Sequence, residues 1–189
     1  MTRNMKTTLA SLFLFGSLSA GAFASTMTTI NGKSVQLSDY VGNGKWTIVE
    51  AWHSKCAICM KTMPEMVKAQ KTFSDATLVG ISLDENIAKT KQVVKRFDID
   101  FPTLLIDIVD FDAYLNKVAK KRLSGVPTYL VFSPEGDLKA LQTGGISLAE
   151  LRNYIRTIKA KHIATLKQTL AEQIIVNQGE VELVNPEKK

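Results

Sequence analysis

The segment from Trp46 to Cys59 restricts the fold of this chain more than any other part of the sequence. Residues 46–52 (Trp-Thr-Ile-Val-Glu-Ala-Trp) are a short, mostly apolar run with Gly42 and Gly44 before it and His-Ser-Lys-Cys after it, which is typical of a buried central strand. The run leads into Cys56-Ala57-Ile58-Cys59, and apolar residues then recur at helical spacing to about Phe73. We therefore expect a buried strand followed by a helix whose N-terminus carries both cysteines.

The two cysteines are the only ones in the 189-residue chain, and they are too close together to cross-link distant parts of a fold. Such a pair indicates chemistry at sulfur, either redox exchange or metal binding. Unpaired N–H groups and the helix dipole would stabilise a thiolate at Cys56, the predicted nucleophile. Cys59, one turn later, is predicted to resolve the mixed disulfide. No cofactor is expected beyond the redox-active disulfide Cys56–Cys59.

The N-terminus has the pattern of a secretory signal peptide. Arg3 and Lys6 precede the apolar residues 9–18, a stretch too short to span a membrane, and Ala22-Phe23-Ala24 follows. We expect cleavage near Ala24-Ser25 and export to the periplasm. The net charge is +6, but the basic residues do not form a run along the sequence. We therefore interpret the charge as a solubility feature and expect no binding of nucleic acid.

The rest of the chain alternates between strand and helix patterns. An N-terminal hairpin is expected around Asn31-Gly32. Beyond the first helix we expect strand 77–83, helix 87–97, strand 103–106, helix 113–121, strand 128–132, edge strand 138–141 and a final helix from 148. This order predicts an α/β fold, a mixed central sheet flanked by helices in a single domain.

Several separated motifs together resemble the thioredoxin superfamily: Trp52-His53-Ser54-Lys55-Cys56-Ala57-Ile58-Cys59, Pro64 and Gly125-Val126-Pro127-Thr128. Two features resemble the TlpA/ResA-like branch of this superfamily. One is the sequence of residues 31–40, and the other is the separation of Cys59 and Pro127, which is longer than in a plain thioredoxin by about one strand-helix unit. The resemblance covers about residues 28–158. It implies a thioredoxin fold with an N-terminal β-hairpin and an inserted strand-helix unit, in an exported thiol:disulfide oxidoreductase that exchanges disulfides with protein substrates and with a membrane electron donor or acceptor.

Glu50 is an ionisable residue inside the predicted buried strand, where a charge is costly unless it is paired or functional. Its position, six residues before Cys56, matches the buried acid that thioredoxins use to move the proton of the resolving thiol. We expect Glu50 to act as acid or base for Cys59. The alternative is a glutamate at the strand edge that reaches solvent.

The resemblance assigns substrate binding to Val126, Pro127 and Trp52. It implies a cis peptide bond at Val126-Pro127, in a loop that faces the cysteines and offers backbone hydrogen bonds to an extended substrate. The alternative is an ordinary trans proline in a turn before a strand.

Lys55 stands where most relatives have an aromatic residue, and Thr62 where many TlpA/ResA-like proteins have a glutamate. Both differences favour the Cys56 thiolate and a more oxidising pair, unless Lys55 points away into solvent. The modulating dipeptide Ala57-Ile58 matches neither thioredoxin nor its strongly oxidising relatives. An envelope reductant is the favoured function, and a DsbA-like oxidant of folding secreted proteins is the alternative.

A thiolate site for Cu(I) or Zn(II) is a third hypothesis, because His53 and the methionines Met60, Met63 and Met66 lie near the pair. The copper chaperones of this superfamily space their cysteines by three residues and add a distal histidine, and His162 lies far along the chain. We assign no metal ligand. A peroxidase is disfavoured because no threonine precedes either cysteine by three residues.

The C-terminal helix is longer than the fold requires. Apolar residues recur from Leu148 to Ile174, and Gly179 is expected to end a helix of about 28 residues. We expect a signal peptide over 1–24, the thioredoxin-like domain over 25–160, and a helical extension and frayed tail over 161–189. The extension has three alternatives: to pack back on the domain, to form a dimer, or to dock a partner.

Overall fold

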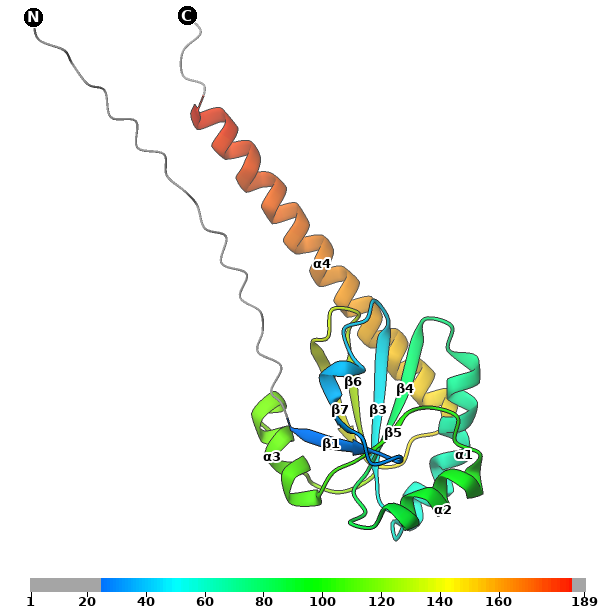
Figure 1. The fold of residues 1–189 in the computed structure, drawn as a ribbon. Coiled ribbons are helices and arrows are strands. Elements are labelled where there is room, and N and C mark those ends of the chain that lie inside the picture. The colour runs from blue at the N-terminus through cyan, green and yellow to red at the C-terminus, as the bar shows by residue number, and fades with distance from the viewer. Residues whose placement is uncertain (1–24, 185–189) are drawn as a thin grey trace, which may run out of the picture.

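The computed structural model describes the backbone of residues 25–184 and the side chains of residues 25–176. The predicted signal peptide lies outside the described residues. The fold is α/β, with one mixed sheet of seven strands in the order β2-β1-β5-β4-β3-β6-β7 and helices on both of its faces (Figure 1). The elements are β1 (Thr26–Thr29), β2 (Ser34–Gln36), the 3-10 turn Leu37–Asp39, β3 (Trp46–Trp52), α1 (Ala57–Thr72), β4 (Ala76–Ser82), α2 (Ile87–Phe97), β5 (Thr103–Leu105), α3 (Ile108–Ala119), β6 (Thr128–Phe132), β7 (Leu138–Thr143) and α4 (Leu148–Val184).

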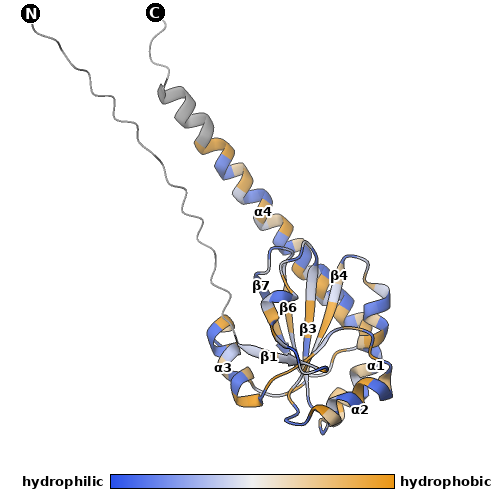
Figure 2. Ribbon diagram, in the orientation of Figure 1, coloured by the Kyte–Doolittle hydropathy of each residue, from blue (hydrophilic) through white to orange (hydrophobic). Residues whose placement is uncertain are grey.

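The central strand is β3, and every one of its residues is buried. It pairs in parallel with β4 and antiparallel with β6. Ile48 and Trp52 belong to a core packed under α1, α2 and α4, whereas Val49 and Ala51 belong to a second core under α3. Because both faces are covered, the apolar residues of the strand run nearly without a break, as Figure 2 shows for the strands inside the domain.

The predicted N-terminal hairpin is confirmed. β1 and β2 pair antiparallel, and Gly32 between them has φ +82°, a left-handed conformation that favours glycine. β1 also pairs with β5, so the hairpin extends one edge of the sheet.

Helix α3 begins at Ile108, five residues before the predicted start at residue 113. Asp107 caps it, because its Oδ1 accepts the backbone N–H of Val109 at 2.7 Å. Ile108 and Val109 are exposed, so the first turn does not follow the amphipathic pattern on which the prediction rested.

Helix α4 has 37 residues and continues past Gly179, where the sequence predicted its end. One glycine costs a helix only about 1 kcal/mol, so it does not have to stop it. Leu151, Ile155 and Ile158 are buried against the domain, but residues 163–176 are exposed and the helix projects away from the sheet (Figure 1). The extension therefore does not pack back on the domain. No helix in the described part of the chain is long and apolar enough to cross a membrane.

Candidate active site

The two cysteines lie at the N-terminus of α1, as the sequence predicted. Cys56 is the N-cap residue, and a disulfide joins it to Cys59, with the two Cα atoms 5.2 Å apart. Cys56 Sγ accepts the backbone N–H of Cys59 at 3.0 Å. Cys56 is half-buried whereas Cys59 is fully buried. A substrate can therefore reach the sulfur of Cys56 and not that of Cys59.

The loop between β3 and α1 is held in place by Asp84, which follows β4 and is almost fully buried. Its Oδ2 accepts the backbone N–H of Ser54 at 3.0 Å, and its Oδ1 accepts the Ser54 hydroxyl. His53 Nε2 lies 3.6 Å from Oδ1 of the same carboxylate, and the carbonyl of His53 accepts the N–H of Cys56 at 2.9 Å. Asp84 thus positions the turn that carries the nucleophile, a connection that sequence analysis missed.

Glu50 is fully buried in the middle of β3, so the alternative of a glutamate reaching solvent is wrong. Burial raises the pKa of its carboxyl to about 8, and the hydrogen bond from Tyr129 offsets this shift only in part. It shares its face of β3 with Trp52, which packs in one core with Cys59. The carboxyl is therefore mostly neutral at pH 7 and titrates close to that pH.

Tyr129 is the second polar residue of this buried region. It lies opposite Glu50 in the pairing of β3 and β6, and its hydroxyl donates to Glu50 Oε1 at 3.0 Å. Glu50 Oε2 has no hydrogen-bond partner among the described residues. Burial and the nearby carboxylate raise the pKa of Tyr129, so it remains a proton donor. Sequence analysis missed this residue because only the strand register reveals its position.

The loop before β6 lies against the disulfide. The Val126-Pro127 peptide is cis, and Cys56 Sγ lies 3.4 Å from the carbonyl oxygen of Val126. The carbonyl of Pro127 accepts the N–H of Gly144 at 2.9 Å, which ties this loop to the segment after β7. Trp52 is fully buried, so it supports the site from beneath and offers no surface to a substrate, contrary to the expected binding role.

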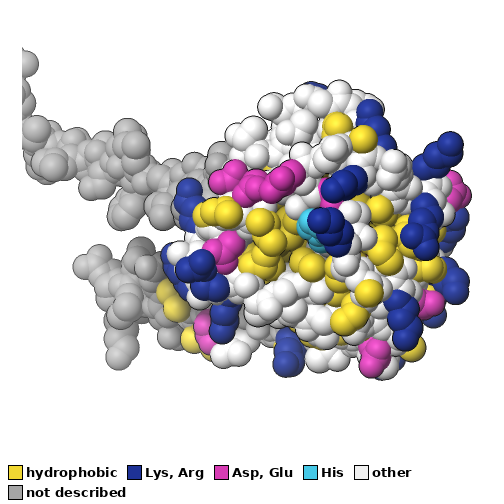
Figure 3. Space-filling view, turned by 90° about the horizontal axis from the view of Figure 1, so that it is seen from below, with side chains coloured by type: hydrophobic (Ala, Val, Ile, Leu, Met, Phe, Trp, Pro, Cys, Tyr) yellow, Lys and Arg dark blue, Asp and Glu magenta, His cyan; other side chains and the backbone are white. Residues whose placement is uncertain are grey.

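Lys55, Ala57 and Ile58 surround the cysteines with exposed side chains. Figure 3 shows this end of the molecule, where hydrophobic side chains gather around a histidine and a Lys or Arg side chain lies directly beside that histidine. Gly145 lies against Ile58, since a Cβ on Gly145 would stand 2.7 Å from Ile58 Cγ2.

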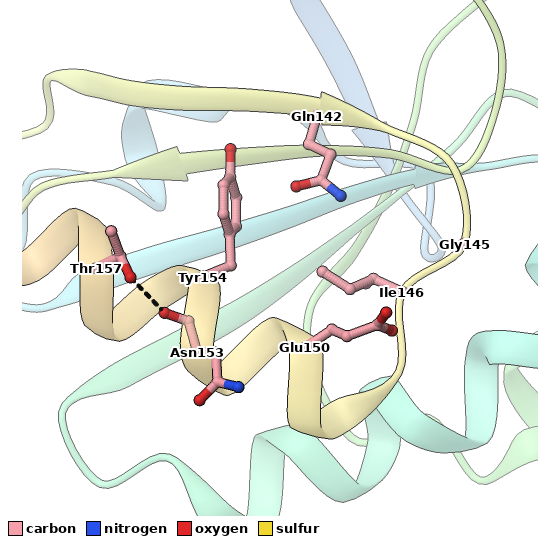
Figure 4. A pocket seen from close by; sticks show the side chains of 7 residues that line it. All are labelled: Gln142, Gly145, Ile146, Glu150, Asn153, Tyr154 and Thr157. Carbon is pink, nitrogen blue, oxygen red and sulfur yellow. Dashed lines mark hydrogen bonds between the residues drawn. The ribbon is translucent and has the colours of Figure 1, made fainter.

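An open hollow of about 420 Å³ adjoins the site at Gly145, between β7 and α4 (Figure 4). It is lined by Gln142, Gly145, Ile146, Glu150, Asn153, Tyr154 and Thr157. The lining contains no cysteine, histidine or lysine. The hollow is therefore connected to the site only through Gly145, which lies against Ile58, and it offers no further group for thiol exchange.

The methionines of the metal hypothesis pack in the same core as Cys59, and the distal histidine lies elsewhere. Met63 and Met66 are buried in the core of the domain. His162 packs edge-on against Trp46, and its Nε2 lies 3.2 Å from a carboxylate oxygen of Glu135. Within residues 25–176, no three His, Cys, Asp or Glu side chains group as a metal site would need.

Comparison with known families matches residues 20–141 to the AhpC/TSA family. The chain belongs to this family. The thiol-disulfide oxidoreductase ResA of Bacillus subtilis (strain 168) is 28% identical over 132 residues, which are 68% of this chain and 69% of that protein. The thioredoxin of Mycoplasma genitalium is 34% identical over 90 residues, which are 48% of this chain and 78% of that protein.

Solved structures show the same fold. A thiol:disulfide interchange protein from Chlorobium tepidum TLS has a TM-score of 0.57 and 25% identity, over 71% of this chain and 92% of that one. A secreted Mycobacterium tuberculosis disulfide oxidoreductase, homologous to E. coli DsbE, has a TM-score of 0.58 and 18% identity, over 70% and 95%. This family member is a thioredoxin-fold thiol:disulfide oxidoreductase related to the TlpA/ResA-like proteins, with the Cys56–Cys59 pair as its redox disulfide.

Proposed function

We propose that the protein is an exported reductant that works on disulfides of other envelope proteins. One observation supports this most: the half-buried Cys56 lies at a helix N-terminus, in front of a fully buried Cys59 and an acid with a raised pKa. An accessible nucleophile with a protected resolving thiol is what disulfide exchange requires.

In the proposed reaction, the Cys56 thiolate attacks one sulfur of a substrate disulfide. The substrate S–S bond breaks, a Cys56–substrate disulfide forms, and the released substrate thiolate takes a proton from water. Cys59 then gives its proton to the ionised fraction of Glu50 and attacks Cys56 Sγ, which expels the second substrate sulfur as a thiolate that takes a proton from water. The substrate gains two electrons and the Cys56–Cys59 disulfide forms. A membrane donor would then reduce this disulfide again.

The proposed contact for the substrate is the Val126-Pro127 loop. The carbonyl of Val126, 3.4 Å from Cys56 Sγ, lies where an extended chain with its cysteine on Cys56 would pass. Pairing through backbone groups requires no particular substrate sequence. We therefore expect several protein substrates and no small-molecule cofactor.

The alternative direction, oxidation of folding secreted proteins, is favoured by two residues. Lys55 adds a positive charge next to Cys56, and Thr62 on α1 is uncharged where a glutamate would oppose the thiolate. Both would stabilise the reduced, thiolate-containing form and so raise the reduction potential.

The reduction potential of the Cys56–Cys59 pair tests the direction. The pair is equilibrated in dithiothreitol or glutathione buffers, and the metal content is measured on the same sample. We expect a reduction potential of about −270 mV, as in thioredoxin. A reduction potential of about −120 mV, as in DsbA, would instead make the protein an oxidant. Stoichiometric metal and no reversible couple would favour the thiolate metal site.

The site assignments have a direct test in trapping. Cys59→Ser is expected to accumulate mixed disulfides with envelope proteins in cells, because the resolving step is lost, whereas Cys56→Ser should trap nothing. Export is tested by fractionation and by sequencing the N-terminus of the mature protein, which is expected at Ser25. Thiol exchange by Cys56→Ser at the normal rate would contradict the mechanism.

A further inference from the structure

His53 lies in the turn between β3 and α1, three residues before the nucleophile Cys56. Its carbonyl accepts the backbone N–H of Cys56 at 2.9 Å, and its ring nitrogen Nδ1 accepts the backbone N–H of Lys55 at 3.0 Å. The ring is partly buried, because only 29% of the side chain is exposed. One residue therefore accepts the last two backbone N–H groups before the reactive sulfur.

These two hydrogen bonds fix the shape of the turn. The bond from the N–H of Cys56 to the carbonyl of His53 closes a four-residue turn, and the bond from Lys55 to the ring resembles the contact that Asn and Asp side chains make in Asx turns. Cys56 follows with φ −80° and ψ 106°, and its Sγ accepts the N–H of Cys59. The turn therefore determines where the sulfur lies relative to the N-terminus of α1.

The bond from Lys55 also determines which ring nitrogen of His53 carries the proton. A nitrogen that accepts an N–H has no proton of its own, so the proton of the neutral ring is on Nε2. Nε2 lies 3.6 Å from Asp84 Oδ1. This is too long for a direct hydrogen bond, but the carboxylate attracts the edge of the ring that bears the proton. Asp84 therefore favours the tautomer in which Nδ1 is free to accept.

Asp84 can orient the ring because its own carboxylate is held firmly. Besides the two donors of Ser54, the hydroxyl of Ser82 donates to Asp84 Oδ2 at 3.0 Å. The hydroxyl oxygen of Ser82 lies 2.8 Å from that of Thr90 on α2, and both residues are fully buried. A buried polar network whose members are paired is rigid. A chain of hydrogen bonds thus runs from α2 through the end of β4 to the active-site turn.

We propose that His53 is a positioning residue for thiol exchange. Its ring and carbonyl hold the backbone in front of Cys56, so that the sulfur stays at the helix N-terminus, and the buried chain of Thr90, Ser82 and Asp84 orients the ring. A misplacement of about 1 Å can slow a reaction by about a hundredfold, so a fixed sulfur is worth such a support. The role applies to exchange in either direction and does not depend on whether the protein acts as a reductant.

Two substitutions of His53 test the role. His53→Leu removes both ring nitrogens, so we expect the reduced protein to react about tenfold more slowly with 5,5′-dithiobis(2-nitrobenzoic acid). The reduction potential should become more negative, because the thiolate is held less well at the helix N-terminus. His53→Asn keeps an acceptor two residues before the N–H of Lys55 and should restore most of the rate and of the potential. A normal rate in His53→Leu, or equal losses in the two variants, would overturn the proposal.

A double-mutant cycle tests the chain that orients the ring. Ser82→Ala removes one donor to Asp84, so it should slow the same reaction in the wild-type background and have little further effect in His53→Leu. Thr47→Val is the matched control, because it removes a buried hydroxyl at the opposite end of β3 and should leave the rate unchanged in both backgrounds. Losses that multiply in the double variant, or an equal loss in the control, would contradict the chain.

Discussion

At the scale of single residues, Glu50 makes the stability of the domain depend on pH. Its pKa in the folded protein, about 8, is above its ordinary value of 4.5, so folding favours the protonated form. The stability that this group contributes is complete below pH 4.5 and is lost as the pH rises through 8, by at most about 5 kcal/mol. Glu50→Gln cannot ionise, so urea unfolding of the oxidised variant is expected to show higher stability than wild type at pH 8 to 9 and no difference near pH 4. If the free energies of unfolding of wild type and Glu50→Gln differed by the same amount at every pH, the raised pKa would be contradicted.

Tyr129 is expected to set the pH at which Glu50 accepts a proton. Tyr129→Phe removes the hydroxyl that donates to Glu50 Oε1, which destabilises the ionised carboxylate and raises its pKa further. The pH profile of the rate at which Cys59 releases substrate from the mixed disulfide should therefore move to higher pH. Tyr114→Phe is the control, since it removes the same atom from a buried tyrosine in the core under α3. Equal shifts in the two variants would show a general packing effect.

At the scale of elements, Asp84 connects the end of β4 to the loop that leads into α1. Asp84→Asn replaces one acceptor oxygen by an amide that faces donors, so we expect a loss of about 1.5–3 kcal/mol in the free energy of unfolding. The reduction potential should change as well, because the turn before Cys56 loosens. Asp100→Asn, at an exposed loop position, is the control and should change neither quantity. Wild-type stability and potential in Asp84→Asn would show that the loop needs no anchor.

At the scale of the whole molecule, the domain and the projecting part of α4 are expected to be energetically separate. Deleting residues 163–189 removes side chains that are exposed in the described range, so the free energy of unfolding of the dilute protein should stay within about 0.5 kcal/mol of wild type. Ile155→Ala, inside the part of α4 that packs on the sheet, should cost about 2–5 kcal/mol. Urea unfolding measures both, and a large loss on deletion would mean that the projection supports the domain.

The sequence alone determined the fold class, the central strand at Trp46–Trp52, the hairpin and the helix that begins at the cysteines. These features depend on local patterns, namely an apolar run, an Asn-Gly turn and helical spacing, which need no knowledge of distant residues. The buried acid could be found in the same way, because a lone ionisable residue in an apolar strand is conspicuous. The sequence pattern did not predict the early start of α3, because a capping aspartate begins a turn that has no apolar face.

Only the tertiary structure decided what completes the site. Tyr129 reaches Glu50 through the register of β3 with β6, and Asp84 reaches Ser54 because parallel strands end at one edge of the sheet. Neither pairing is encoded by spacing along the chain. The structure also decided that Trp52 is buried and that residues 163–176 leave the domain, because burial depends on which surfaces meet in space and a sequence pattern shows only which residues are apolar.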